Sequence, residues 1–152
     1  MLLSSLFVAT SVCAMIRTLP FPDLVKSAHV IVIAKVIKKV SGPKSKYGYP
    51  QIKNILMSEK VLKGDLAIHE TFEILTPNTK GKWREDVVIL PDKGRRVILF
   101  LKKRTHEDPF NIVNGIQGLW PLQEGSNKTL GMGFRYSIND IEKELRSDIH
   151  DK

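Results

Sequence analysis

The sequence contains a single cysteine, Cys13, among 152 residues. One thiol cannot form a disulfide within the chain, and it supplies one ligand where a structural zinc ion needs several. The fold must therefore be held together by a packed core. The hydrophobic content of 42% is sufficient for such a core, and 26% charged residues are typical of a folded protein of one domain.

Motifs that carry catalysis are also missing. The chain has no Gly-x-Ser-x-Gly elbow and no glycine-rich phosphate loop after a predicted strand. The densest group of potential metal ligands, His106-Glu-Asp108, precedes a proline, which favours a solvated turn. Adjacent carboxylates such as Glu85-Asp86 point to opposite faces of a strand. We therefore predict no catalytic residue, no metal site and no cofactor.

No hydrophobic run is long enough to span a bilayer as a helix. Residues 1–14 carry no charge and match the apolar core of a secretory signal, with Val12 and Ala14 as small residues before a cut at Met15. No Lys or Arg precedes this run, so the alternative is an N-terminal helix or strand docked on the core. The signal interpretation predicts a secreted or periplasmic protein with one domain over residues 15–152.

The strongest secondary-structure signal lies between Phe21 and Gly64. Residues 30–34 are consecutive apolar residues, mostly β-branched, and apolar residues then alternate with Lys as far as Val40. This pattern is typical of a strand that is buried on both faces first and on one face later. The short segment 23–27 before it predicts one or two helical turns.

Further strands follow from apolar patterns bounded by turn residues. They are predicted over 51–63, 71–76, 87–90 and 96–102, with a hairpin of 110–113 and 116–122 around Asn114-Gly115. A change of phase within 51–63 predicts a β-bulge. Ser137 can cap a C-terminal helix whose Ile141 and Leu145 lie on one face. The expected fold is mostly β, a small antiparallel OB-like barrel with a short helix before the first strand and a helix at the C-terminus.

This fold predicts a specific core. Val30, Val32, Ala34 and Val36 should point into the barrel, together with Leu62, Leu99 and Leu101. The C-terminal helix should pack through the apolar face that contains Ile141 and Leu145.

The positive charge is concentrated in one quarter of the chain. Between Leu24 and Gly64 there are nine lysines and one acid, Glu59, a net charge of +8, which equals the net charge of the whole chain. The candidate partner-binding residues are Lys35, Lys39, Lys44, Lys46, Tyr47, Tyr49 and Lys53. Lys35, Lys39 and Lys53 are expected to share one face of the sheet.

Three interpretations of this basic region remain open. Lysines are the usual solvated residues of an edge strand, where they oppose aggregation. They also attract an anionic surface or polymer. Lysines with tyrosines between them are, in addition, found in grooves for single-stranded nucleic acid, although this region has no Arg.

Several short motifs resemble those of a known family. In order, they are Asp23-Leu-Val-x-x-Ala28, Val30-Ile-Val-Ile-Ala-Lys-Val36, Val61-Leu-Lys-Gly64 and Gly94-Arg-Arg-Val-Ile-Leu-Phe-Leu101. This series resembles the netrin-like domain, the OB-type barrel of the tissue inhibitors of metalloproteinases. The segment Gly115-Ile-Gln-Gly-Leu-Trp120 is more similar to small secreted prokaryotic proteins with the same core. The resemblance covers residues 21 to 122 and implies the fold and secretion. Protease inhibition is not implied, because Cys13 has no second cysteine to complete the Cys-x-Cys of the inhibitors.

We therefore expect an extracytoplasmic binding or interaction module, without catalysis and monomeric, whose partner is a protein or an anionic polymer or surface. The alternative is an OB-type protein that binds single-stranded nucleic acid inside the cell. A third hypothesis is an enzyme whose site the sequence conceals. Asn127-Lys-Thr129 is also a glycosylation sequon in a predicted loop.

Overall fold

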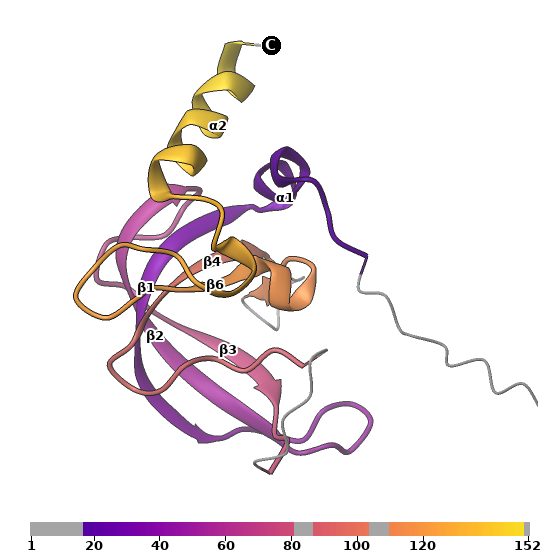
Figure 1. Cartoon of the computed structure of the whole chain (residues 1–152). Helices are drawn as coiled ribbons and strands as arrows, with labels where there is room; N and C mark the ends of the chain where they lie inside the picture. The colour runs from indigo at the N-terminus through magenta and orange to yellow at the C-terminus, as the bar shows by residue number, and fades with distance from the viewer. Residues whose placement is uncertain (1–16, 81–86, 104–109, 151–152) are drawn as a thin grey trace, which may run out of the picture.

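The computed structural model describes residues 17–80, 87–103 and 110–150. The predicted signal segment 1–14, the Glu85-Asp86 pair and the trio at 106–108 lie outside these residues. The described elements are α1 (Phe21–Ser27), β1 (Val30–Ser41), β2 (Gln51–Lys63), β3 (Thr71–Pro77), β4 (Arg96–Lys102), β5 (Asn111–Ile112), the 3-10 helix η1 (Gly115–Gly118), β6 (Leu119–Pro121), the 3-10 helix η2 (Gly131–Gly133) and α2 (Ile138–His150). Figure 1 shows their arrangement.

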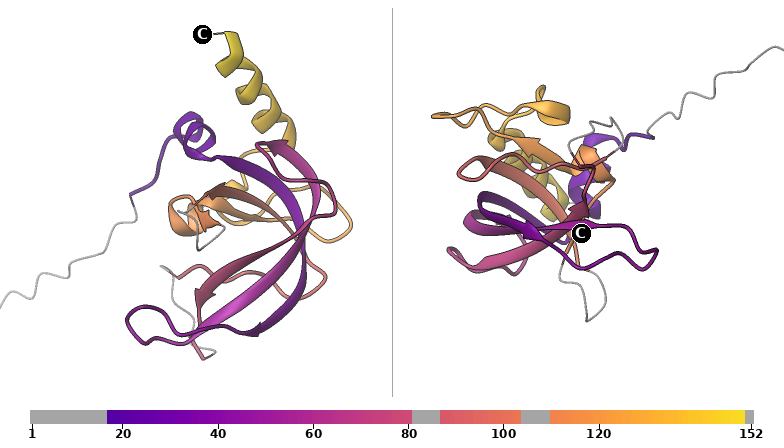
Figure 2. Two further views of the ribbon diagram at one scale, coloured as in Figure 1. Left: turned by 180° about the vertical axis from the view of Figure 1, so that it is seen from behind. Right: turned by 90° about the horizontal axis from the view of Figure 1, so that it is seen from below.

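The strands form one antiparallel sheet in the order β3-β2-β1-β4-β5, and β6 also pairs with β4. The long strands β1 and β2 bend strongly, so that the sheet curls around its own inner face (Figures 1 and 2). The predicted antiparallel β fold, the short helix before β1 and the C-terminal helix are confirmed. Closure of the sheet into a barrel is not confirmed. In the described residues, β3 and β5 are the two edge strands and do not pair with each other. The rings of Phe72 and Phe110 make an edge contact at 5.7 Å between those two ends.

The two faces of the sheet are covered by separate hydrophobic clusters, because side chains on a strand alternate between its faces. Val30, Val32, Ala34 and Val36 belong to the inner cluster. The inner cluster also contains Leu56, Phe72, Ile74, Leu90, Val97, Leu99, Leu101 and Leu119. The inward direction predicted for the alternate residues of β1, and for Leu99 and Leu101, is confirmed.

The prediction for Leu62 is wrong, and a β-bulge is the reason. Ile31 pairs with Lys63 and Val32 pairs with Val61, so Leu62 is an extra residue in β2 at this point. An extra residue reverses which face the following side chains occupy. As a result, Val61 packs against the inner cluster and Leu62 packs against the outer one. The bulge predicted for the middle of β2 is confirmed by a second irregularity, which leaves Glu59 as an extra residue; the bulge at Leu62 was not predicted.

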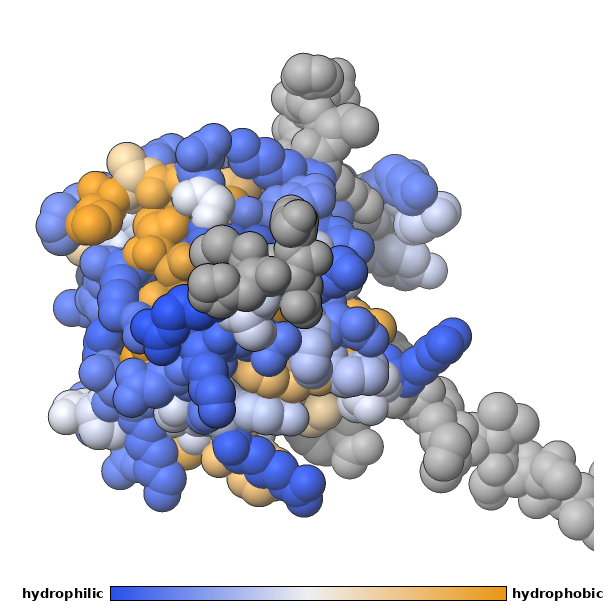
Figure 3. Space-filling model, turned by 90° about the horizontal axis from the view of Figure 1, so that it is seen from above, coloured by the Kyte–Doolittle hydropathy of each residue, from blue (hydrophilic) through white to orange (hydrophobic). Residues whose placement is uncertain are grey.

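The outer cluster is built around Trp120. Its ring lies 4.7 Å from Phe100 and 5.6 Å from Tyr136, measured between ring centroids. Leu24 and Val25 of α1 and Ile141 of α2 are buried in the same cluster, with Leu145 packed against it. The predicted packing face of the C-terminal helix is therefore confirmed. Away from this contact, Figure 3 shows hydrophilic side chains over most of the face seen from above, with hydrophobic surface gathered on one side.

The hairpin predicted around Asn114-Gly115 is wrong. Both residues have the positive φ that the turn requires, 49° and 59°, but the chain continues into η1. Strands β5 and β6 then pair with successive parts of β4 and not with each other. Residues 87–90 are likewise not a strand, although Leu90 is buried in the inner cluster.

Ser137 caps α2 as predicted. Its Oγ accepts a hydrogen bond from the Asp140 backbone N–H at 3.2 Å, and the Ser137 backbone N–H donates to Asp140 Oδ2 at 2.7 Å. This reciprocal arrangement satisfies backbone groups that the first turn of a helix leaves unpaired. The Ser137 hydroxyl also donates to Asp140 Oδ2 at 2.7 Å.

These contacts predict a pH effect at the start of α2. The side-chain and backbone hydrogen bonds from Ser137 lower the pKa of the Asp140 carboxyl below its ordinary value. Because the folded pKa is the lower one, the stabilisation is complete above the unfolded pKa and is lost as pH falls through the folded pKa. We expect Ser137→Ala to raise the pKa of Asp140 toward its ordinary value in an NMR pH titration. The Glu142 carboxyl is the control, because the hydrogen bond from Lys60 lowers its pKa, and this pKa should not change in Ser137→Ala. An unchanged Asp140 pKa would contradict the role assigned to Ser137.

Candidate functional site

The lysines of β1 and β2 do not all lie on one face. Lys35 pairs with Met57, Lys38 with Ile55 and Val40 with Lys53. These positions lie opposite to the inner cluster, so Lys35, Lys38 and Lys53 share the outer face of the hairpin. Lys39 pairs with the buried Asn54 on the inner side. The prediction that Lys35, Lys39 and Lys53 share a face is therefore wrong for Lys39.

The reason is a bulge on β1. Val36 pairs with Leu56 and Lys38 pairs with Ile55, which leaves Ile37 as an extra residue. Four-residue spacing keeps two side chains on the same face only in a regular strand. The bulge turns Lys39 inward, where its ammonium donates a hydrogen bond to the Leu90 carbonyl at 2.6 Å. Lys39 therefore ties β1 to residues 87–90, and its half-buried side chain does not join Lys35 and Lys53 on the outer face.

The loop between β1 and β2 has a defined conformation. Ser45 Oγ accepts hydrogen bonds from the backbone N–H groups of Tyr47, at 3.3 Å, and Tyr49, at 3.1 Å. The Ser45 backbone N–H donates to the Tyr49 carbonyl at 2.8 Å. This small hydroxyl-centred turn replaces backbone pairing where the strands end.

The turn directs both tyrosines into solvent. Tyr47 is 74% exposed and Tyr49 is 69% exposed, the two highest values among the large hydrophobic residues of the described chain. Lys44 and Lys46 are exposed beside them, and the Lys46 ammonium lies 4.9 Å from the centroid of the Tyr47 ring. We call these four residues the hairpin tip. Its two cations and two aromatic rings form the most accessible part of the predicted site.

Most of the remaining lysines of the basic quarter have partners. Lys53 forms an ion pair with Glu73 at 3.1 Å, and Lys60 with Glu142 at 2.7 Å. Lys63 donates to the Val25 carbonyl at 2.9 Å, near the end of α1. The basic quarter is thus spread over the hairpin tip, both faces of the β1–β2 hairpin and the region near the helices. The nine lysines between Leu24 and Gly64 therefore do not form a single basic patch on the surface.

A second feature, not found from the sequence, is a cleft of about 400 Å³ beside the start of α2. Its lining residues are Ile33, Glu59, Lys60, Arg96, Asn127, Ser137, Ile138 and Asn139. Arg96 donates from Nε to Glu59 at 2.6 Å and from Nη1 to Asn127 Oδ1 at 3.0 Å. Because Glu59 and Arg96 neutralise each other, the cleft has little charge with which to recruit an ion.

The sequence signal for this cleft is weak. Glu59 reaches Arg96 because it is the extra residue of a bulge, and Asn127 comes from a distant loop. In the same loop, Thr129 is buried and its hydroxyl donates to the Tyr136 carbonyl. The first and last residues of the sequon, Asn127 and Thr129, therefore both make side-chain hydrogen bonds that hold this loop in place.

The chemistry of catalysis is not assembled in the part of the chain that the structure describes. Across residues 17–80, 87–103 and 110–150, no group of three or more His, Cys, Asp or Glu side chains is arranged to hold a metal ion. Within the same ranges, none of the helices has the length and hydropathy needed to cross a bilayer.

The protein is a curled antiparallel sheet with two helices packed on its outer face. It presents a basic and aromatic hairpin tip to solvent. Comparison of the chain with protein-family models and with curated proteins gives no match.

Proposed function

We propose that this chain is an extracytoplasmic binding module, without catalysis, on a netrin-like OB barrel, and that it contacts an anionic polymer or surface through the hairpin tip. The observation that carries the proposal is the exposure of Tyr47 and Tyr49 beside Lys44 and Lys46. Neighbouring exposed aromatic rings are typical of surfaces that contact a partner. The uncharged segment 1–14 supports the extracytoplasmic location.

The electrostatics of the hairpin favour an anionic partner. No Asp or Glu occurs between Leu24 and Ser58, so β1 and the part of β2 nearest the tip carry no negative charge; Glu59, further along β2, is paired with Arg96. Glu73 of β3 compensates Lys53 but lies on the strand and not at the tip. Lysine is a flexible point charge without the fixed geometry of arginine, which suits a partner with distributed charge. Such a surface attracts anions over a distance set by the ionic strength.

Charge reversal at the tip tests this proposal. We expect the double variant Lys44→Glu and Lys46→Glu to lose most of its retention on a heparin column, because repulsion replaces attraction at the contact. Wild-type retention should fall steeply as salt rises, since each neutralised anionic group releases counterions. Lys39 is left unchanged, because its ammonium is engaged with the Leu90 carbonyl.

The control is the double variant Lys102→Glu and Lys103→Glu, which changes the net charge equally at exposed positions near the end of β4. This control should retain most of the binding. Equal losses in the two double variants would mean that net charge decides retention and that the tip is only a solvated surface.

The second candidate function is binding of single-stranded nucleic acid, which the two exposed tyrosines favour because bases stack on aromatic rings. The double variant Tyr47→Ala and Tyr49→Ala separates the two functions. If it loses oligothymidine binding as completely as the lysine variant does, nucleic acid is the partner. If heparin binding persists without the tyrosines, charge attraction to an anionic polymer is the function.

A further inference from the structure

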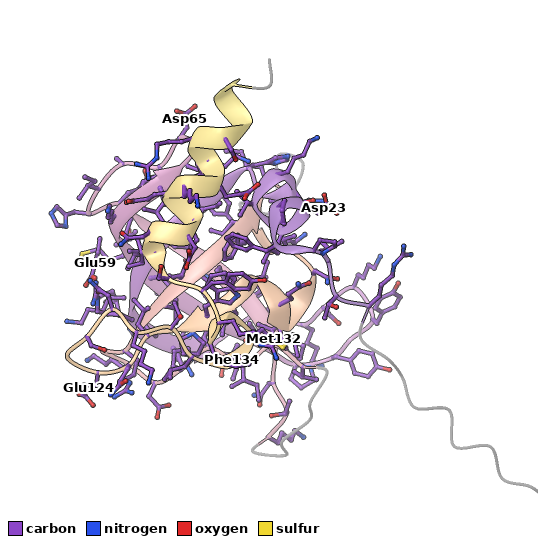
Figure 4. All side chains as sticks on the ribbon, turned by 45° about the horizontal axis from the view of Figure 1, so that its top comes forward. Asp23, Glu59, Asp65, Glu124, Met132 and Phe134 are labelled. Atoms are coloured by element: carbon purple, nitrogen blue, oxygen red, sulfur yellow. The ribbon has the colours of Figure 1, made fainter. Side chains whose placement is uncertain are left out.

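A second exposed surface lies far from the hairpin tip in the sequence. Three apolar side chains within five residues face solvent: Leu130 at 37%, Met132 at 40% and Phe134 at 63% exposure. They flank and form η2, and we call them the apolar turn. Figure 4 shows Met132 and Phe134 next to each other, with all four labelled carboxylates, including Glu59 and Glu124, lying away from them.

The apolar turn is held in place by what lies beneath it. Gly133 is buried against Trp120, and a Cβ at this position would come within 2.2 Å of the indole ring. The Thr129 hydroxyl closes the loop by donating to the Tyr136 carbonyl, and the Tyr136 ring stacks on Phe21 at 4.2 Å. Because the inner side of the turn is already filled, the three apolar side chains cannot fold inward.

Within the segment that carries the apolar turn the charges are of one sign, and Asp140, the first acid after it, is engaged by hydrogen bonds from Ser137. Residues 125–139 contain Lys128 and Arg135 and no Asp or Glu. The Arg135 guanidinium lies 5.2 Å from the centroid of the Phe134 ring, so a cation accompanies the most exposed aromatic side chain. Glu124, the nearest acid before this segment, is paired with Arg95.

We propose that the apolar turn inserts into the interface of an anionic phospholipid bilayer, with Met132 and Phe134 among the acyl chains and with Lys128 and Arg135 at the level of the headgroups. Apolar side chains flanked by cations are the pattern by which surface-bound proteins enter that interface. Anionic headgroups complement the two cations. The surface is distinct from the hairpin tip and does not depend on the function proposed for it.

A folded protein partner fits this surface less well. An aromatic side chain buries about 150–250 Å² in total, so three partly exposed apolar residues fall well short of the roughly 800 Å² per partner of a standard interface. None of the three lines the cleft beside α2. A fluid bilayer needs no complementary groove and accepts a small protruding turn.

Co-sedimentation with vesicles tests the inference. We expect the wild type to bind vesicles that contain phosphatidylglycerol and phosphatidylcholine, and the double variant Met132→Ser and Phe134→Ser to bind about tenfold or more weakly, because less apolar area leaves water. Ile68→Ser and Ile89→Ser, a control pair of apolar side chains that are 61% and 44% exposed and belong to neither the apolar turn nor the hairpin tip, should bind nearly as the wild type does. Equal weakening by the two pairs, or no binding by the wild type, would overturn the inference.

A second measurement reports insertion directly. We expect Phe134→Trp to add fluorescence that brominated lipids quench more strongly than they quench the wild type. Absence of additional quenching would overturn insertion even if the protein sedimented with vesicles. A concentration-dependent dimer that is lost in Met132→Ser and Phe134→Ser, without vesicle binding, would instead assign the apolar turn to contact between two copies of this chain.

Discussion

Replacing Val32 with Asp is expected to unfold the protein. Val32 is fully buried, faces the inner cluster and pairs with Leu99 on one side and Val61 on the other. A carboxyl group at this position has no partner, and burial without one costs several kcal/mol. That cost is comparable to the whole stability of a typical domain, about 5–15 kcal/mol. Circular dichroism should show loss of the β signal and no cooperative thermal transition.

Val40→Asp is the matched control on the same strand. Val40 is half-buried and pairs with Lys53 on the outer face. A carboxylate there remains in contact with water and lies near a cation, so the loss of stability should be small and the melt cooperative. If Val32→Asp is soluble and melts as cooperatively as Val40→Asp, β1 is not the centre of the core.

The second large effect is expected for Trp120→Ala. Trp120 joins the outer cluster through rings from α1, β4 and the loop before α2, and its Nε1 donates to the Gln117 carbonyl at 2.7 Å. Truncation of a buried aromatic side chain costs about 3–5 kcal/mol, because a cavity remains and the carbonyl loses its donor. Urea unfolding followed by circular dichroism should show the midpoint moving strongly to lower denaturant.

Phe134→Ala is the control, since it removes an aromatic ring from the same loop region at a position that is 63% exposed. Its stability should change by no more than about 0.5 kcal/mol. Similar losses for the two variants would mean that Trp120 does not anchor the helices to the sheet. The same control shows that variants of the apolar turn remain folded.

Much of the fold could be predicted because its signals are local. The β-branched run at 30–34 strongly favours a strand, and Ser137 meets Asp140 within one helical turn. The phase change in 51–63 predicted a bulge correctly, since a shifted apolar pattern is the direct trace of an extra residue. The exposed loop of the candidate site was predictable for the same reason, because Gly and Pro mark it in the sequence.

The sequence by itself determined the four long strands β1 to β4, the terminal helices, the inward face of β1 and the charge of the hairpin tip. Only the tertiary structure decided that Lys39 points inward, that Leu62 belongs to the outer cluster and that β5 and β6 share β4. The directions of Lys39 and Leu62 depend on the positions of β-bulges, and the pairing of β5 and β6 depends on which strand edge is open to them. Both are set by packing against residues that are distant in the sequence. The exposure of Phe134 is also decided by tertiary packing: the Trp120 ring lies directly against Gly133, and the Phe134 side chain next to it faces solvent.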